Sequence, residues 1–153
     1  DIGELSTAEY VYQISSVMDK AGLTLPRNIK ITSSKVVYSY EGTIKAGIQF
    51  GKIQIDINTT QSPAKVYVHL PEAEIFSNEL NNDSLKVYDE KYSNFNKVSF
   101  KDVNQSQNNC KEQAREAALD SGLLEKASEN AQTMIRSMLY GFLDSEKYEI
   151  EFY

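Results

Sequence analysis

Apolar and polar residues alternate along most of the first two thirds of the chain, a pattern that predicts β-strands with one buried face. The alternation is cleanest in Lys52–Asn58 and Ala64–Leu70, which flank the short segment Thr59–Pro63. We expect the two flanking segments to form a β-hairpin with the short segment as its turn. The first strand of this hairpin carries three alternating isoleucines, which we expect to face the core: Ile53, Ile55 and Ile57.

Further strands are predicted where residues alternate or where β-branched and aromatic residues are frequent. These segments are Thr7–Val17, Lys35–Tyr40, Thr43–Phe50, Ser84–Tyr92 and Lys147–Tyr153. A short helix over Leu5–Tyr12 is an open alternative for the first of them. Glu41 and Gly42 are expected to interrupt the chain between the second and third segments. Asn81–Asp83 is expected to form a turn before the fourth segment, whose charged residues favour the edge of a sheet.

The spacing of apolar residues changes to three and four at Ser99, which indicates helices. Ser99 with Asp102 resembles a capping box at the start of the first helix, which we expect to end near Asp120. Gly122 then breaks or bends the helix. A second apolar stripe follows and consists of Leu123, Leu124, Ala127, Ala131, Met134, Ile135, Met138, Leu139 and Phe142.

These elements predict an α+β fold. A mostly antiparallel sheet, formed by the amino-terminal half and a closing carboxyl-terminal strand, packs against a helical unit at about 99–143. A length of 153 residues suits one domain. We therefore expect a single domain over 1–153 that is sheet-rich over 1–98 and closes with a strand at 147–153.

Charge is spread unevenly along the chain and limits the possible partners. Residues 1–70 carry seven Lys/Arg and six Asp/Glu, whereas residues 71–153 carry nine and sixteen, and the whole chain has a net charge of −6. Nucleic-acid binding relies on Lys and Arg that neutralise phosphates, so we expect no nucleic-acid partner. No apolar run approaches the ~20 residues that cross a bilayer.

Several common catalytic and metal-binding arrangements are excluded by the residue types. The chain has one histidine, His69, and one cysteine, Cys110, so a zinc site built from His and Cys is not available. A Ser-His-Asp triad would have to use His69, and no Gly-x-Ser-x-Gly motif accompanies it. We expect a structural role for His69, a buried structural role for Cys110, and neither a metal nor a cofactor.

Paired carboxylates leave one enzymatic alternative open. Glu72 and Glu74 follow Pro71, and Asp89 and Glu90 lie in a predicted strand. Two carboxyl groups at a suitable separation can hydrolyse a glycosidic bond. The alternative function is therefore a carboxylate-dependent hydrolase of a cell-wall or glycan substrate that uses Glu72 and Glu74 with Tyr67.

A binding surface is the leading expectation. Gly-x-x-x-Ala-Gly after Glu41 and Leu-Pro-x-Ala-Glu-Ile after His69 impose specific backbone geometry, and Pro71 is placed to begin a helical turn over Glu72–Phe76. The candidate surface residues are Gly42, Gly47, His69, Pro71, Glu72 and Glu74. The Met134/Met138 pair, with Ile135 and Leu139, is a second candidate for a partner groove, because methionine-rich faces adapt to partners.

The order of several short motifs resembles a bacterial family, the domain of unknown function number 4230. These motifs are Leu5-x-Thr7-x-Glu9-Tyr10, Tyr40-x-Gly42 with Ala46-Gly47-Ile48, Leu70-Pro71-x-Ala73-Glu74-Ile75, Tyr88-Asp89-Glu90 with Phe95-Asn96, and the alanine-rich segment Gly122–Ala131. The resemblance covers nearly the whole chain. It carries no catalytic residues.

The resemblance implies where such a protein works. Family members have a single amino-terminal membrane helix before this domain, so we expect an extracytoplasmic domain tethered to the cell membrane by an anchor outside this chain. A first residue of Asp1 rather than Met agrees with an excised segment. The expected function is non-catalytic binding of a protein or envelope component, with homo-oligomerisation through the strand edges at Ser84–Tyr92 or Lys147–Tyr153 as a further possibility.

Overall fold

The computed structural model describes residues 3–20, 24–25, 29–30, 34–91 and 99–153. The chain folds into two compact units, and each is assembled from segments that are distant in the sequence. Unit 1 comprises residues 1–10, 44–77 and 119–153, and unit 2 comprises residues 11–43 and 78–118. The expectation of a single domain over 1–153 stays a prediction.

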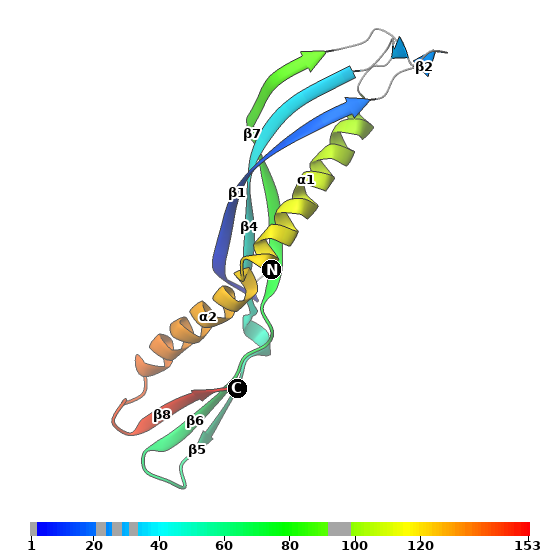
Figure 1. The fold of residues 1–153 in the computed structure, drawn as a ribbon. Helices are drawn as coiled ribbons and strands as arrows, with labels where there is room; N and C mark the ends of the chain where they lie inside the picture. The colour runs from blue at the N-terminus through cyan, green and yellow to red at the C-terminus, as the bar shows by residue number, and fades with distance from the viewer. Residues whose placement is uncertain (1–2, 21–23, 26–28, 31–33, 92–98) are drawn as a thin grey trace. The chain divides into compact units, whose positions relative to one another are not determined.

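Unit 1 contains a three-stranded sheet in the order β5-β6-β8. β5 (Gln54–Asn58) and β6 (Ala64–His69) pair antiparallel, and β8 (Tyr148–Phe152) joins the other side of β6 in parallel. The predicted hairpin and the predicted closing strand are therefore both confirmed. Figure 1 shows these three strands side by side with α2 (Leu123–Tyr140).

The core of unit 1 is aliphatic. Ile48, Val66 and Val68 from the strands pack with small and branched residues of α2, and the complete buried cluster is Ile48, Val66, Val68, Ala131, Ile135 and Ile150. Alanines at 127 and 131 are fully buried, which lets the α2 backbone approach the sheet closely. Gly122 precedes α2 in a left-handed conformation with φ of 80°, which a residue without Cβ adopts at little cost.

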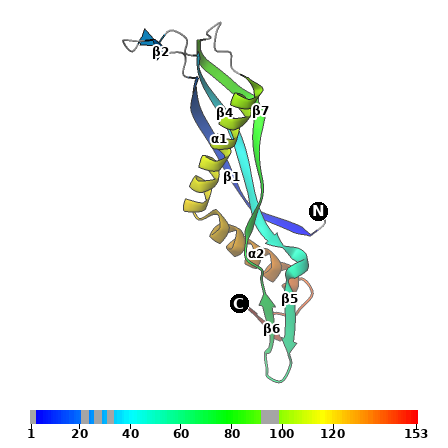
Figure 2. The same cartoon turned by 90° about the vertical axis from the view of Figure 1, so that its right-hand side faces the viewer.

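Unit 2 holds parts of three long strands in the order β1-β4-β7 and the helix α1 (Phe100–Asp120). The strands are β1 (Glu4–Lys20), β4 (Ser34–Gln49) and β7 (Glu74–Lys91), and their arrows show that β4 runs opposite to its neighbours (Figure 1). The buried cluster of this unit is Val36, Tyr38, Tyr40 and Cys110. α1 lies along one face of the strands in both views (Figures 1 and 2). A short antiparallel pair, β2 (Thr24–Leu25) with β3 (Ile29–Lys30), is also formed.

The predicted start of the first helix is confirmed in atomic detail. The backbone N–H of Ser99 donates to the Asp102 carboxylate at 2.8 Å, and the backbone N–H of Asp102 contacts the Ser99 hydroxyl at 3.3 Å. This reciprocal pair is a capping box, which satisfies amide groups that have no partner inside the helix. The observed helices also end and begin on either side of Gly122, as the sequence predicts.

Three predictions about strand interruptions are wrong. β4 runs without a break through Glu41 and Gly42, and β7 is a strand from Glu74 onward, where a helical turn over Glu72–Phe76 was expected. β7 also runs through Asn81–Asp83, although the Asn81 side chain accepts a hydrogen bond from the backbone N–H of Asp83 at 3.1 Å, as in a turn. Pairing with neighbouring strands outweighs these local preferences.

The strand segments predicted around Thr7–Val17 and Lys35–Tyr40 are confirmed, and the short-helix alternative for Leu5–Tyr12 is wrong. The predicted strand Ser84–Tyr92 is confirmed up to Lys91, and β7 lies at the edge of its sheet, as its charges indicate. Within the described ranges, no helix is long and apolar enough to cross a membrane.

Candidate functional site

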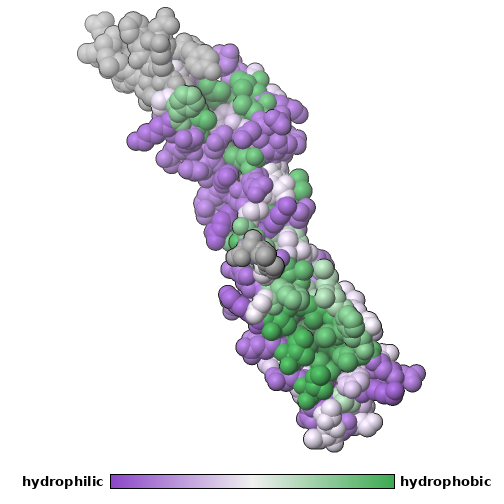
Figure 3. Space-filling view, turned by 180° about the vertical axis from the view of Figure 1, so that it is seen from behind, coloured by the Kyte–Doolittle hydropathy of each residue, from purple (hydrophilic) through white to green (hydrophobic). Residues whose placement is uncertain are grey.

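An apolar groove lies between β5 and α2 in unit 1, and we call it the β5–α2 groove. Its volume is about 220 Å³. The residues that line it are Phe50, Ile53, Ile55, Ile135, Met138, Leu139 and Phe142. Figure 3 shows apolar side chains gathered in a broad green area on this unit.

The groove exists because α2 covers only part of the sheet's apolar face. The strand register aligns Ile57 with Val66 and Ile55 with Val68 in cross-strand rows. Val66 and Val68 are fully buried, whereas Ile55 is 47% exposed and Ile57 is 55% exposed. These two isoleucines lie on the face of the sheet that carries the core, but they are exposed there. The prediction that they are part of the core is therefore wrong.

The width of a helix, compared with the spacing of strands, explains why β5 is uncovered. A helix with its side chains is about 10 Å across, and neighbouring strands are about 4.8 Å apart, so one helix covers about two strands. α2 packs through Ala131 and Ile135 on Val66, Val68 and Ile150, which belong to β6 and β8. β5, the edge strand of this sheet, is left bare.

The α2 wall of the groove presents residues of large, adaptable shape. Met134 and Met138 lie four residues apart and so share one side of the helix. They are 42% and 49% exposed, and Phe142, just past the helix end, is 88% exposed. Unbranched thioether side chains adjust to the shape of a partner. Met138, Ile135 and Leu139 line the groove, as the sequence pattern suggested, whereas Met134, the other member of the predicted pair, does not, and their binding role stays a prediction.

Unit 1, which contains this apolar surface, is strongly acidic in composition. Its segments carry six Lys/Arg and thirteen Asp/Glu, whereas those of unit 2 carry ten and nine. Asp144 and Glu146 follow Phe142 closely in the chain. The Lys147 ammonium nitrogen lies 3.0 Å from an Asp144 carboxylate oxygen, and its hydrogen bond lowers the pKa of Asp144. The backbone N–H of Glu146 also donates to this carboxylate and lowers the pKa further. This carboxylate therefore stays charged into acid solution.

The opposite face of the same sheet carries a polar row that includes Tyr67. Asp56, Tyr67 and Glu151 are cross-strand neighbours and line a shallow hollow of about 380 Å³ with Phe152 and Tyr153. Lys65 forms an ion pair and hydrogen bond with Glu151, which raises the pKa of Lys65. Glu72 and Glu74 do not line this hollow, so the structure does not bring them together with Tyr67 there. The hydrolase alternative stays a prediction.

His69 lies on this second face at the end of β6. Its ring packs against Tyr153 with a centroid distance of 5.1 Å. Among the described residues, its Nδ1 atom has no hydrogen-bond partner although it is buried. The His69 side chain thus packs as part of the fold. In the described ranges, no cluster of three or more potential metal ligands occurs.

Pro71, Glu72 and Glu74 lie where β6 leads into β7. Glu72 and Glu74 are exposed, and the Glu74 carboxylate accepts a hydrogen bond from the Gln49 side-chain amide at 2.9 Å. They line neither the β5–α2 groove nor the hollow beside Tyr67. Their proposed role in binding stays a prediction.

Gly42 and Gly47 are buried and allow close approach of other chain segments. A Cβ at Gly47 would lie 1.9 Å from the carbonyl oxygen of Leu5. A Cβ at Gly42 would lie 2.4 Å from the ring of Tyr12, whose hydroxyl donates to Asn78 at 2.8 Å. Glycine is needed at both positions for β1 to pack on β4, and any role in binding stays a prediction.

Cys110 is buried, 1% exposed, and free. It packs against Tyr38 and Tyr40 in the core of unit 2, as expected for a cysteine on the apolar stripe of a helix.

The role of β5 and Phe50 in the apolar groove was not predicted from the sequence. The alternation of β5 predicts an apolar face but cannot show whether a helix covers it.

The fold and the groove define an α+β protein whose exposed concave surface is apolar. The family model described as "Protein of unknown function (DUF4230)" matches residues 1–150. The chain therefore belongs to this family, as the resemblance of its motifs indicated. No curated protein and no solved structure matches it.

Proposed function

We propose that this protein is a non-catalytic binding domain that holds an amphipathic, basic helix of another protein in the β5–α2 groove. The single observation that carries the proposal is the exposed apolar face of β5 beside Met138 and Phe142. Monomeric proteins rarely leave a large apolar patch uncovered unless it has a partner. A helix laid beside α2 would cover β5 and complete the layer over the sheet.

Charge selects the kind of partner. The excess of seven acidic residues in unit 1 attracts a helix with Lys and Arg on its polar face, because complementary potentials favour association. The same charge repels a second copy of unit 1, an anionic lipid surface and a nucleic acid. A basic segment of another protein therefore fits better than each of these occupants.

The location is part of the proposal and follows the family resemblance. The domain would work outside the cytoplasm, tethered to the cell membrane by a segment that lies outside this chain. Protease treatment of intact cells that make the full-length protein tests this location. Digestion is expected, and full protection in intact cells with digestion after lysis would contradict it.

The groove is tested with a synthetic peptide of Leu and Lys at helical spacing, which offers an apolar face and a basic face. We expect this peptide to bind at micromolar concentration in isothermal titration calorimetry. The same peptide with Glu in place of Lys should bind at least tenfold more weakly. A Leu/Lys peptide that alternates with period two distinguishes addition of a strand to β5 from docking of a helix.

Variants separate the apolar contact from charge attraction. The double change Met138→Gln and Phe142→Ser leaves the net charge unchanged, and we expect it to weaken the helical Leu/Lys peptide at least tenfold. Val11→Ser removes an exposed apolar residue of unit 2, 72% exposed, and serves as the matched control with unchanged binding. Equal binding by the double variant and the native protein would mean that charge alone holds the peptide, and the proposal would be wrong.

A further inference from the structure

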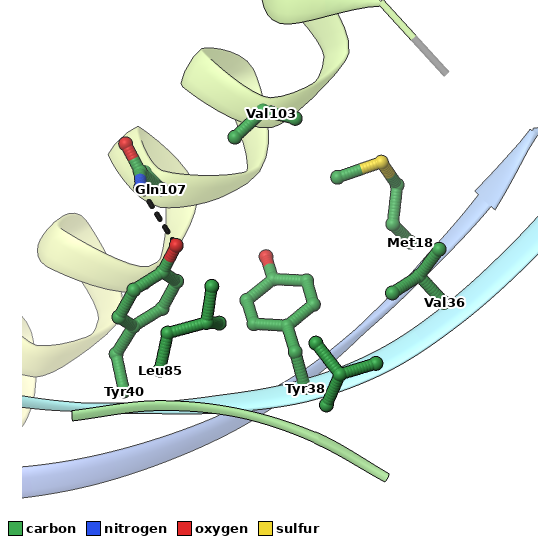
Figure 4. A pocket seen from close by; sticks show the side chains of 8 residues that line it. Met18, Val36, Tyr38, Tyr40, Leu85, Val103 and Gln107 are labelled. Atoms are coloured by element: carbon green, nitrogen blue, oxygen red, sulfur yellow. Dashed lines mark hydrogen bonds between the residues drawn. The ribbon is translucent and has the colours of Figure 1, made fainter. Parts of the chain in front are cut away.

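A second concave site lies inside unit 2, between its strands and the first turns of α1, and we call it the tyrosine cavity. Its volume is about 110 Å³. Its walls come from all three strands and the helix: Met18, Val36, Tyr38, Tyr40, Leu85, Val87, Val103 and Gln107. Figure 4 shows Val103 and Gln107 on the helix above the two tyrosines of β4.

The cavity follows from the side chains that α1 turns toward the strands. Val103, Gln107, Cys110 and Ala114 follow one another at spacings of three and four, and only the last two are buried. Val103 is too short to fill the space opposite the strands. At the mouth, Leu85 and Val87 remain 45% and 48% exposed. Close packing, which is the rule in protein interiors, is therefore not reached here.

The tyrosines are held in place by neighbours. The rings of Tyr38 and Tyr40 meet edge to face with centroids 5.5 Å apart. The Tyr38 hydroxyl forms a hydrogen bond with Ser106 and lies 3.9 Å from the Cys110 sulfur. Burial raises the pKa of Tyr38, and the hydrogen bond with Ser106 opposes this effect only in part, so the phenol stays neutral.

Tyr40 supplies a directed polar group. Its hydroxyl oxygen accepts a hydrogen bond from the Gln107 side-chain amide at 2.9 Å, as the dashed line in Figure 4 shows. A phenol has one proton to donate besides its acceptor lone pairs. Since the bond with Gln107 uses a lone pair, the Tyr40 proton can be donated to an acceptor atom in the cavity.

We propose that the tyrosine cavity binds a small neutral molecule through one aromatic ring or short alkyl chain, with a carbonyl or ether oxygen that accepts the Tyr40 proton. The size is near that of this class, because a closed apolar cavity of about 150 Å³ takes up a benzene ring. Walls of Met, Val and Leu favour an apolar ligand over water. The proposal does not depend on the β5–α2 groove, which is built from other residues.

Methyl NMR with two probes of similar shape tests the site. Acetophenone carries a carbonyl and ethylbenzene does not. We expect acetophenone to shift the methyl signals of Met18, Val36 and Val103 in a saturable way, while those of Val66 and Ile150 in the buried core of unit 1 stay in place. Ethylbenzene should bind roughly 2- to 10-fold more weakly, the range expected for one net hydrogen bond.

Two variants fill the cavity from different sides. Val103→Phe fills it from α1, and Leu85→Trp fills it from the exposed mouth, where a larger residue is less disruptive to folding. Unchanged methyl signals of Ala114 and Ala118, which are buried in unit 2 away from the cavity, report that each variant is folded, and either folded variant should lose binding of both probes. Absence of saturable shifts in the native protein, or unchanged binding in a folded variant, would overturn the site. Equal affinity for the two probes would overturn the role of Tyr40.

Discussion

Each unit packs one helix against a three-stranded sheet, but the two units leave space in different places. In unit 1, α2 packs tightly on the middle of the sheet with Ala127, Ala131 and Ile135, and the uncovered apolar surface lies outside, at β5. In unit 2, the space lies under α1, where the strands present Tyr38 and Tyr40. The difference comes from what each helix meets on the strands, which is aliphatic side chains in unit 1 and tyrosines in unit 2.

Small residues allow a helix to come close, and large residues on the sheet hold it away. The fully buried Ala131 of α2 meets Val66 and Val68 of β6 in an aliphatic core. α1 instead meets tyrosines whose hydroxyls need partners, and Ser106 and Gln107 supply them. Where α2 packs closely on the sheet, the uncovered apolar surface lies beside the helix, at β5. Where α1 meets the tyrosines and their polar partners, a cavity remains beneath the helix.

The charges follow the same division. Unit 1 has an excess of seven acidic residues, whereas unit 2 has one more basic than acidic residue. An apolar groove beside an exposed strand of an acidic unit suits a basic macromolecular partner, and a smaller apolar cavity in a near-neutral unit suits a small uncharged ligand. Three sets of substitutions test how far this comparison holds.

The largest effect is expected at the glycines of β4, because each unit uses one of them. Gly47→Ala in unit 1 would place Cβ 1.9 Å from a backbone oxygen that cannot move aside, so we expect a loss of about 3 kcal/mol or more in the free energy of unfolding. Gly42→Ala in unit 2 meets the Tyr12 ring at 2.4 Å and the backbone oxygen of Glu79 at 2.8 Å. Since its backbone contact is longer than that at Gly47, this change should cost less, about 2 kcal/mol. Urea unfolding followed by circular dichroism measures both.

Gly51 provides the matched control for these two changes. No atom lies within 4 Å of a Cβ added there. Gly51→Ala should leave the free energy of unfolding unchanged or raise it by about 0.5 kcal/mol through the unfolded state. If Gly47→Ala were as mild as Gly51→Ala, the close approach of β1 to β4 in unit 1 would be incorrect.

An intermediate effect is expected from one cross-strand row of unit 1. Val66 and Ile57 are register partners on the same face, but Val66 is fully buried and Ile57 is 55% exposed. Val66→Ala should cost about 2 kcal/mol or more in unfolding free energy, because it leaves a cavity beneath α2. Ile57→Ala should cost less than about 1 kcal/mol although it removes more atoms. Equal costs would show that β5 is covered, and the groove would not be open.

The smallest effect concerns the acidic end of unit 1. The pKa of Asp144 is lowered in the folded protein, so its stabilising contribution is present above its unfolded pKa and is lost as the pH falls through the lower folded value. Asp144→Asn should therefore lower the urea midpoint slightly at neutral pH and have no effect in strong acid. Lys147 has a raised pKa, so the contribution of its charge disappears only in strongly alkaline solution.

Salt provides the control for this pair. Both side chains are exposed, 46% for Asp144 and 75% for Lys147, so their attraction is screened at high ionic strength. The difference in urea midpoint between Asp144→Asn and the native protein at neutral pH should shrink in 1 M salt, where the Debye length is only about 3 Å. A difference that persists in salt would assign the effect to the hydrogen bonds of Asp144 rather than to its charge.

Much of the secondary structure could be predicted from the sequence because local patterns determine it. The capping pair Ser99 and Asp102 marks the start of α1, and Gly122 separates the helices because its left-handed conformation suits glycine. The hairpin of β5 and β6 follows from strict alternation on both sides of a turn. The resemblance of the motifs also identified the family that the chain belongs to.

The sequence could not show which side chains are covered, because burial depends on what packs against a residue. Ile57 and Val66 have the same kind of pattern around them, yet only Val66 lies beneath α2. Likewise, the turn signals at Gly42 and Asn81 are real local preferences, but strand pairing with neighbours distant in sequence carries β4 and β7 through both. Periodicity determined the faces of the elements, and only the tertiary structure decided which parts of those faces remain open for a partner or a ligand.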